Sequence, residues 1–464
     1  MFKPAKVIVI LLFTGAVSFL LAYNPLLGFL ACLGLLLGVL IFLDLKLGLV
    51  LVIFSLVLGQ LVRIPLPGTE SFFLPNDMII PAMIIFWIFE KLVKRDFKIQ
   101  STPLDAPLFL FLGIALISLI WGIRNLAWEE ALVSSFYYLR FLEYALLFYV
   151  VLDVARGTKG VKKYVAWIFV CSFILAILGF LQYIFVPDFS AMAAKAGWDP
   201  HVKRLLSTWF DPNFMGGFFV FILSFVLSFF LIAQNRKHRL FLAILGLVLF
   251  GALILTYSRS AFLAFLAMLL VLGILKSKKL LLGGLAALLI LVGVSDRLQT
   301  RLAGATEVDV TAQARIASWL ATWEIAQDHL FLGVGFNTFK YVQSEYGKIG
   351  SEASHSDFGS DSSFLTILVT TGIFGFLAYL WLLGAMFWVS FRAWRRENNN
   401  KVAAALGLGM LGALSGMLVH SQFTNSLLYP HFMEVIWIFL ALVMRSQNLH
   451  EMINKENKIS NYSN

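Results

Sequence analysis

The chain has 464 residues, of which 60% are hydrophobic and 13% are charged, and its mean hydropathy is +0.86. Soluble domains carry roughly 25% charged residues, so this composition excludes a soluble globular protein and predicts a multi-pass membrane protein. The formal net charge is +10. The basic residues stand in short clusters between apolar runs, where they indicate membrane topology and not nucleic-acid binding.

Apolar runs long enough to cross a bilayer recur along the whole chain, and each is continuous, which is typical of helices and not of barrel strands. We predict an all-α polytopic fold with about 12 to 14 transmembrane helices. Cys32 and Cys171 lie inside such runs, so no disulfide framework is expected. The predicted spans are 7–22, 26–42, 47–62, 77–90, 105–121, 132–152, 164–186, 213–233, 240–256, 261–275, 280–294, 363–391, 402–420 and 427–444.

The basic clusters predict an orientation and a division of the chain. With a cytoplasmic N-terminus, they all fall on the cytoplasmic side, as the positive-inside tendency requires. The clusters are Lys91/Lys94/Arg95/Lys98, Arg156/Lys159/Lys162/Lys163, Arg236/Lys237/Arg239, Lys276/Lys278/Lys279 and Arg392/Arg395/Arg396. A membrane part, 1–295, is then followed by a long loop outside the cytoplasm, 296–362. The last spans occupy 363–445, and the polar tail 446–464 is expected to be cytoplasmic and disordered.

Several arginines fall on or near the predicted outer face, against the positive-inside tendency, and an anionic ligand would explain them. They are Arg63, Arg124, Arg204, Arg259, Arg297, Arg301 and Arg315. Arg140 lies inside the sixth predicted span, where a charge is costly and usually faces a cavity. Arg140 and Glu143 are i and i+3 neighbours, so they could instead satisfy each other.

Within the long loop, residues 309–325 have the pattern of an amphipathic helix that could lie along the membrane surface. Arg315 stands one turn before Trp319 on this helix, and it could be a snorkelling side chain or a ligand-binding one. Gly333-Val334-Gly335-Phe336-Asn337 is expected to end the helix and turn the chain. The apolar stripe is formed by Ile316, Trp319, Leu320 and Trp323.

Two earlier polar segments interrupt the apolar runs. Asp211-Pro212-Asn213 is a good cap and start for the eighth span, but capping does not explain the nearby Arg204. The planar guanidinium of an arginine suits phosphate oxygens. Ser258-Arg259-Ser260 separates two further apolar runs, and a tight turn between antiparallel helices explains it as well as a ligand site does.

Read together, these motifs resemble the O-antigen ligase and O-antigen polymerase family of membrane glycan transferases. Its members have an Arg ahead of a Pro-Asn that opens a span, a Ser-Arg-small turn, an Arg-x-x-x-Trp and a Gly-x-Gly-Phe turn, in that order. Here these are Arg204 with Pro212-Asn213, Ser258-Arg259-Ser260, Arg315 to Trp319, and Gly333 to Phe336. The resemblance covers roughly residues 200 to 390, and the rest only by topology.

The family's ligase signature is a His, then Asn, Ser or Gln, nine residues and a Gly-x-x-Gly. Here Asp361 stands in place of that His, ahead of Ser362 and of Gly372-Ile373-Phe374-Gly375. A carboxylate can act as a general base toward an acceptor hydroxyl, and the replacement favours a polymerase over a ligase. His355 is an alternative base. His355, Asp357 and Asp361 could otherwise hold a divalent cation, and Asp361-Ser362-Ser363 could be merely a helix cap.

The resemblance implies an inverting glycosyltransferase of the C type in the cytoplasmic (inner) membrane, with its site on the outer face. The donor would be a glycan on undecaprenyl pyrophosphate and the acceptor a glycan or a lipid, with no metal or nucleotide cofactor. Alternatives are a ligase that joins the glycan to lipid A core, and a transporter or flippase for a lipid-linked or anionic substrate. Expected catalytic residues are Asp361, Arg315 and His355, and expected pyrophosphate ligands are Arg204, Arg259 and Arg140.

Overall fold

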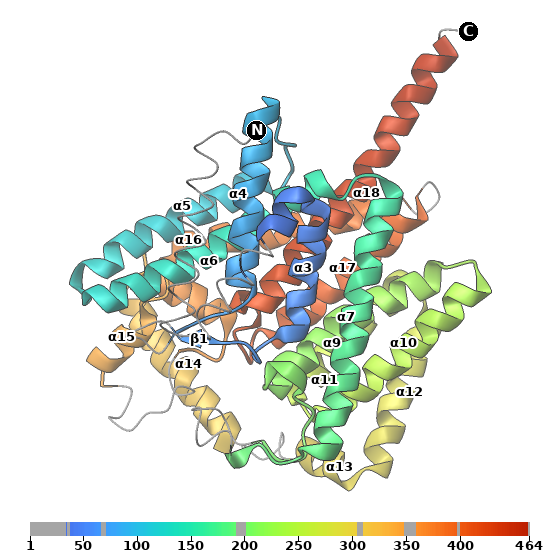
Figure 1. The fold of residues 1–464 in the computed structure, drawn as a ribbon. Helices are drawn as coiled ribbons and strands as arrows, with labels where there is room; N and C mark the ends of the chain where they lie inside the picture. The colour runs from blue at the N-terminus through green and yellow to red at the C-terminus, as the bar shows by residue number, and fades with distance from the viewer. Residues whose placement is uncertain are drawn as a thin grey trace, which may run out of the picture.

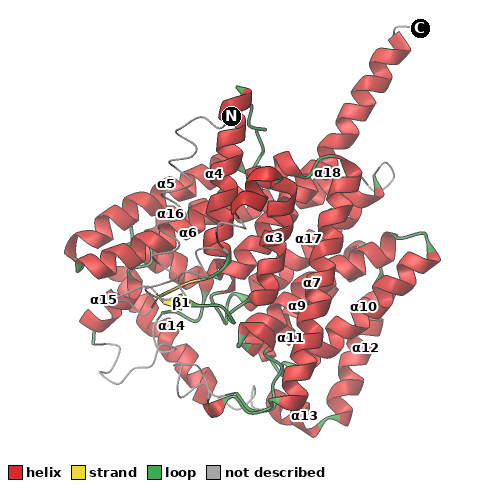
Figure 2. Ribbon diagram, in the orientation of Figure 1, coloured by secondary structure: helices red, strands yellow, loops and turns green. Residues whose placement is uncertain are grey.

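The computed structural model describes residues 34, 38–65, 71–191, 201–303, 310–347, 359–396 and 400–462. Nearly all regular structure within them is helical, as Figure 2 shows. A short antiparallel pair of strands, β1 (Ile64–Pro65) and β2 (Phe72–Phe73), lies in the connection between the helices Leu45–Leu58 and Asn76–Lys94. The described part of the chain is therefore an all-α membrane protein, as the composition predicts.

Every predicted span from 47–62 onward coincides with a helix, while 7–22 and most of 26–42 lie outside the described residues. The helices are α3 (Leu45–Leu58), α4 (Asn76–Lys94), α5 (Asp105–Gly122), α6 (Trp128–Val154), α7 (Gly157–Phe185), α9 (Pro212–Ile232), α10 (Arg236–Leu255), α11 (Arg259–Leu275), α12 (Lys278–Val294), α16 (Ser363–Trp394), α17 (Lys401–His420) and α18 (Pro430–Tyr462). Among the described residues, seven helices (α5, α6, α7, α9, α10, α16 and α17) are long and apolar enough to cross a bilayer. α3 and α11 are apolar but shorter.

Polar side chains between the apolar runs start the helices by accepting hydrogen bonds from the first free backbone N–H groups. Such caps are Asp44 for α3, Asp211 for α9, Asn235 for α10, Ser258 for α11, Ser277 for α12, Ser362 for α16 and Asn400 for α17. At the start of α16 it is Ser362, and not Asp361, whose side chain accepts from Leu365. Ser362 is therefore the residue of this segment that caps α16.

The helix α17 lies at the centre of the bundle, where it packs against α9, α11 and α16. Small residues allow the close approach to α9, since a Cβ on Gly412 would lie 2.4 Å from the hydroxyl of Ser224. Across the same interface Ser224 donates to the Gly409 carbonyl at 2.6 Å, and Ser228 donates to the Ala405 carbonyl at 2.7 Å. Packing of small residues with serine hydrogen bonds is typical of helix pairs in membranes.

The helix α16 is broken at Gly372, which has a φ of 66°. The loop that follows the helix α14 (Val310–Asp328) inserts at this break. There, the backbone N–H of Val334 donates to the Val369 carbonyl at 2.9 Å. In return, the N–H of Ile373 donates to the Leu330 carbonyl at 2.7 Å. A break in a membrane helix is tolerated when other protein groups satisfy its backbone in this way. The insertion ties the long polar segment to α16.

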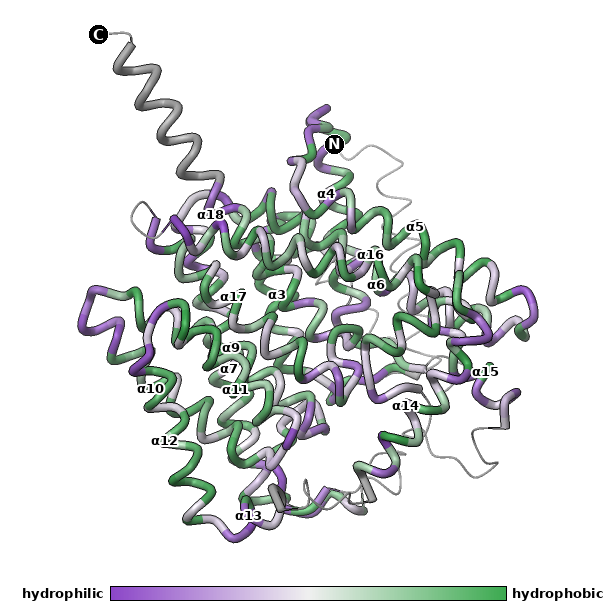
Figure 3. The backbone as a smooth tube through the Cα atoms, turned by 180° about the vertical axis from the view of Figure 1, so that it is seen from behind, coloured by the Kyte–Doolittle hydropathy of each residue, from purple (hydrophilic) through white to green (hydrophobic). Residues whose placement is uncertain are grey.

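The segment 296–362 contains the helices α13 (Asp296–Ala303), α14 (Val310–Asp328) and α15 (Phe339–Glu345). The prediction of a helix over 309–325 is confirmed, and Gly333, Gly335 and Asn337 all have positive φ in the turn that follows. α14 packs against α16. In Figure 1, α13 and α14 lie at one end of the molecule, while the last turn of α4 and the projecting end of α18 lie at the other. Figure 3 shows hydrophobic residues along the helices between these ends.

Candidate functional site

A turn between α17 and α18 holds the segment just before α16 in place. In this turn, Asn425 donates from its amide nitrogen to the Ser360 carbonyl at 2.5 Å and accepts from the Thr366 hydroxyl at 2.8 Å. The backbone N–H of Ser363 donates to the Ser421 carbonyl at 2.9 Å. The position of residue 361 is therefore set by contacts with a segment about sixty residues away in the sequence.

Arg315 and Asp361 meet between α14 and this segment. The Nε of Arg315 lies 3.8 Å from Oδ2 of Asp361, and the two side chains are 19% and 48% exposed. Three buried polar atoms nearby have no hydrogen-bond partner among the described residues: Nε of Arg315, Nε1 of Trp319 and Oγ of Ser360. Buried donors are nearly always satisfied in folded proteins, so this arrangement is suited to an oxygen-rich ligand.

A cavity of about 390 Å³ adjoins this group, and Thr366 and Asn425 belong to its lining. The same two residues hold Ser360 and the start of α16, so the cavity and the Arg315–Asp361 pair are neighbours. Two arginines, Arg63 and Arg140, belong to the lining of the cavity. Its other polar lining comes from Gln60, Tyr137, Asn337 and Tyr429.

Arg140 faces this cavity from α6 as a paired charge. Its Nε donates to Oδ1 of Asp77 at 2.7 Å, and its Nη2 contacts the second carboxylate oxygen and the Phe72 carbonyl. The alternative that Arg140 and Glu143 satisfy each other is therefore wrong, because Asp77 at the start of α4 takes that place. Oε1 of Glu143 is buried without a hydrogen-bond partner among the described residues.

Arg63 lies in the connection between α3 and α4 and was not assigned to the site by the sequence analysis. Its Nε donates to Oε1 of Gln60 at 2.5 Å, and its guanidinium lies over the Phe72 ring. Burial lowers the pKa of Arg63, while Tyr429 and Tyr137 act in the opposite direction. An arginine nevertheless stays protonated at neutral pH. The signal that could have identified it is an arginine on the predicted outer face with no basic cluster around it.

The structure brings the Arg204, Pro-Asn and Ser-Arg-Ser motifs together at one joint. Arg204 is buried, and its Nε donates to the Thr256 carbonyl at 2.9 Å while its Nη2 donates to Oδ1 of Asn213 at 3.3 Å. Ser258 donates to the same Asn213 oxygen at 2.8 Å. Arg259 is half-buried at the first position of α11. Neither arginine is among the lining residues of the cavity.

His355 and Asp357 lie outside the described residues, so the alternative base and the proposed cation site stay predictions. Across the part of the chain that the structure describes, no cluster of three or more His, Cys, Asp or Glu residues is arranged to hold a metal ion.

Comparison with protein-family models matches residues 244–380 to the family described as O-antigen ligase. This stretch is similar to that family. It runs from α10 into α16 and contains Arg259, Arg315, Asp361 and Gly372, so the resemblance seen in the motifs is confirmed. Among curated proteins, no sequence matches the chain.

Beyond the matched stretch, His420 at the end of α17 is a residue to which the sequence analysis gave no role. Its Nδ1 lies 2.7 Å from the Ser426 hydroxyl, and its Nε2 lies 3.0 Å from the Asn213 carbonyl. A carbonyl can only accept, so Nε2 carries the hydrogen. Gly217 makes room for the ring, because a Cβ there would lie 2.8 Å from it. His420 thus joins α9 to the turn that carries Asn425.

Proposed function

We propose that the protein is an inverting membrane glycosyltransferase that takes a glycan from an undecaprenyl-pyrophosphate donor and adds it to a growing surface polysaccharide. One observation carries the proposal. The exposed carboxylate of Asp361 is paired with Arg315 in the stretch that matches the O-antigen ligase family, and a cavity lined by Arg63 and Arg140 adjoins this pair. This set of groups suits an anionic leaving group on one side and an acceptor hydroxyl on the other.

The cationic groups would bind the donor pyrophosphate and stabilise the charge that develops on it as the sugar leaves. Arg63 and Arg140 line the cavity, and Arg315 has a buried Nε without a hydrogen-bond partner in the described structure. Guanidinium groups bind phosphate oxygens with two donors at once, which fixes the direction of departure. Arg259 is a further proposed ligand, and so is Arg204 if it gives up one of its present hydrogen bonds.

The Asp361 carboxylate would accept the proton of the acceptor hydroxyl. The hydroxyl oxygen forms a bond to the anomeric carbon as the bond from that carbon to the pyrophosphate oxygen breaks. Attack from the side opposite the leaving group inverts the anomeric centre. The 48% exposure of Asp361 and its loose contact with Arg315 leave room for an acceptor. His355 is the alternative base.

A polymerase is the favoured form of this activity, and a ligase acting on lipid A core is the alternative. The reason is the Asp361 that stands where the ligase signature has His. In this scheme the pyrophosphate is the leaving group and arginines supply the positive charge, so the reaction requires neither a nucleotide nor a metal.

The test is a transfer assay with the purified full-length protein and a lipid-pyrophosphate oligosaccharide, in which product length is followed by electrophoresis. Asp361→Asn should lower kcat by about 10²-fold or more, since it removes the base, and Arg315→Ala should lower it by about 10²-fold. Arg124→Ala is the matched control, because Arg124 is exposed on the predicted outer face and stacks on Trp121 away from the cavity.

Each outcome is informative. An Asp361→Asn protein with unchanged turnover would move the base to His355, and His355→Ala would then be compared. If the wild-type protein changes the leaflet of the lipid-linked glycan without changing its length, the transferase proposal is wrong and a flippase takes its place.

A further inference from the structure

A second cavity, of about 480 Å³, lies at the other end of α4 from the candidate site. The first turn of α4 carries Asp77, the partner of Arg140, and the last turn carries Lys91 and Lys94, which line the second cavity. Nineteen residues of helix at about 1.5 Å each separate the two ends by about 28 Å, close to the thickness of the hydrocarbon core. The second cavity is therefore distinct from the candidate site.

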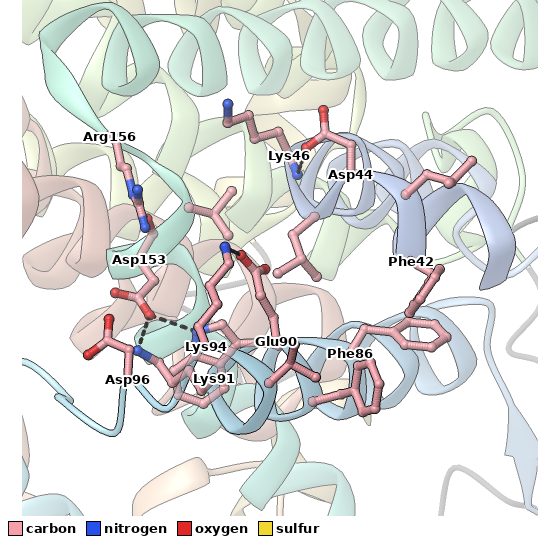
Figure 4. A pocket seen from close by; sticks show the side chains of 16 residues that line it. Phe42, Asp44, Lys46, Phe86, Glu90, Lys91, Lys94, Asp96, Asp153 and Arg156 are labelled. Carbon is pink, nitrogen blue, oxygen red and sulfur yellow. Dashed lines mark hydrogen bonds and ion pairs between the residues drawn. The ribbon is translucent and has the colours of Figure 1, made fainter.

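Side chains of both charges line this cavity in equal number. The cations are Lys46, Lys91, Lys94 and Arg156. The anions are Asp44, Glu90, Asp96 and Asp153. They come from the start of α3, the end of α4 and the junction of α6 with α7, as Figure 4 shows. Four cations against four anions give no net charge, which favours a zwitterionic ligand over a simple anion or cation.

Some of these charges are used within the protein. Nζ of Lys91 lies 2.7 Å from Oδ2 of Asp153, which also accepts from the indole nitrogen of Trp87 at 2.8 Å. Lys94 pairs with Glu90. The two contacts of Asp153 join the end of α4 to the end of α6, whereas Lys94 and Glu90 pair within α4 (Figure 4).

Other charges at the rim are free to meet a ligand. Lys46 is exposed, and its ammonium group forms no ion pair within the described part of the chain. Its backbone N–H, and not its side chain, donates to Asp44 at 2.9 Å. Arg156 is also exposed, and its Nε donates to the Asp153 carbonyl at 3.1 Å. Lys46 in α3 and Arg156 between α6 and α7 therefore offer cationic hydrogen-bond donors from two different parts of the rim.

An apolar surface flanks the polar rim. Phe42 is 56% exposed, Leu43 is 72% exposed and Phe89 is 50% exposed, and all three line the cavity. Lysines and arginines at the ends of apolar helices are expected where lipid headgroups meet the hydrocarbon. A polar cavity with an exposed apolar flank at this depth matches an amphiphile whose headgroup is charged and whose tail is apolar.

We infer that this cavity binds the headgroup of a phospholipid that carries both a phosphate and a primary amine, such as phosphatidylethanolamine. The phosphate contacts Lys46 and Arg156. The ammonium group contacts the second carboxylate oxygens of Glu90 and Asp44, beside those that Lys94 and the backbone N–H of Lys46 contact. The acyl chains lie along Phe42 and the neighbouring apolar surface. A primary ammonium has three hydrogen-bond donors and a quaternary one has none, so the acidic side chains select against choline lipids.

The inference is tested by native mass spectrometry of the purified full-length protein exchanged into micelles that contain phosphatidylethanolamine, phosphatidylcholine or phosphatidylglycerol at equal concentration. The phosphatidylethanolamine adduct should be retained most strongly, by about tenfold over either of the others. Lys46→Ala should lower its retention by about tenfold, since it removes a charge-assisted contact. Lys159→Ala is the matched control, an exposed lysine in the first turn of α7 that does not line the cavity.

Equal retention of the three lipids would overturn the inference. An equal loss of phosphatidylethanolamine retention in Lys46→Ala and Lys159→Ala would also overturn it. Stronger retention of phosphatidylglycerol would show an anion site and would also overturn it. Gel filtration of each variant shows that the fold is intact. The readout requires no turnover, so it stands or falls separately from the proposed transferase activity.

Discussion

At the scale of single residues, the arginines of this protein differ in what neutralises them. Arg140 and Asp77 are a buried pair, with side chains 5% and 1% exposed. Removing one partner of such a pair leaves an uncompensated charge, whereas removing both is far less costly. Arg315, by contrast, meets Asp361 only at 3.8 Å and has a hydrogen-bond donor to spare. Asp77 therefore fixes the Arg140 guanidinium in place at the cavity, whereas Arg315 is suited to exchange its contact with Asp361 for a ligand.

We therefore predict strong coupling between Arg140 and Asp77. Arg140→Met should lower the stability by about 3 to 5 kcal/mol, because Asp77 stays buried without its cation. The double variant with Asp77→Asn should recover a large part of the loss. Thermal unfolding in detergent, followed by intrinsic fluorescence, measures the four proteins of this double-mutant cycle. Additive losses in the double variant would show that the pair is not coupled.

Sequence reasoning identified Arg140 as a costly charge in a span, but the partner that it offered as an alternative, Glu143, is not the one in the structure. Glu143 is three residues away and was visible as a neighbour, whereas Asp77 is 63 residues away. The same limit explains Arg63, which was recognised as unusual on the predicted outer face but not as part of the cavity. Contacts between distant segments have no local signature in one sequence.

At the scale of elements, the break in α16 positions the candidate site. A Cβ on Gly372 would lie 2.1 Å from the Phe331 carbonyl oxygen, and its φ of 66° is one that other residues rarely adopt. The Gly372 and Gly375 of the sequence motif thus have a structural reason. Gly372 lets the loop after α14 approach the helix that begins beside Asp361, and a Cβ on Gly375 would meet the hydroxyl of Thr371.

Gly372→Ala is predicted to destabilise the protein by about 3 kcal/mol or more, because backbone strain adds to a clash with backbone atoms that cannot move away. Gly384→Ala, in the same helix, has nothing within 4 Å of the added Cβ and serves as the control. That variant should be neutral or slightly stabilising. The midpoint of thermal unfolding compares the two, and equal midpoints would contradict the role given to the break.

At the scale of the whole molecule, the long polar segment and the basic end of α4 lie at opposite ends of the bundle (Figure 1). This arrangement agrees with the orientation predicted from the basic clusters, in which α14 is outside the cytoplasm. The proposed chemistry requires that orientation, because a donor presented on the outer leaflet must reach Arg315 and Asp361.

Cysteine labelling tests the orientation. In a variant with Cys32 and Cys171 replaced by serine, a cysteine introduced at Lys340 in α15 should react with a membrane-impermeant maleimide in intact spheroplasts. A cysteine introduced at Lys278 should react only after permeabilisation, because it lies in a predicted cytoplasmic cluster. The reverse pattern would place the candidate site on the cytoplasmic side and contradict the proposed donor.

The sequence by itself determined the membrane class, the positions of the apolar helices from α3 onward, the helix α14 and the similarity to the O-antigen ligase family. These properties follow from local quantities, namely the transfer energy of apolar runs, capping residues and short ordered motifs. Only the tertiary structure decided that Asp77 neutralises Arg140, that Arg63 shares its cavity, and that His420 and Asn425 hold the segment before α16. Each of these depends on which distant segments pack together, and that is decided by the summed packing of many helices and not by any one stretch of sequence.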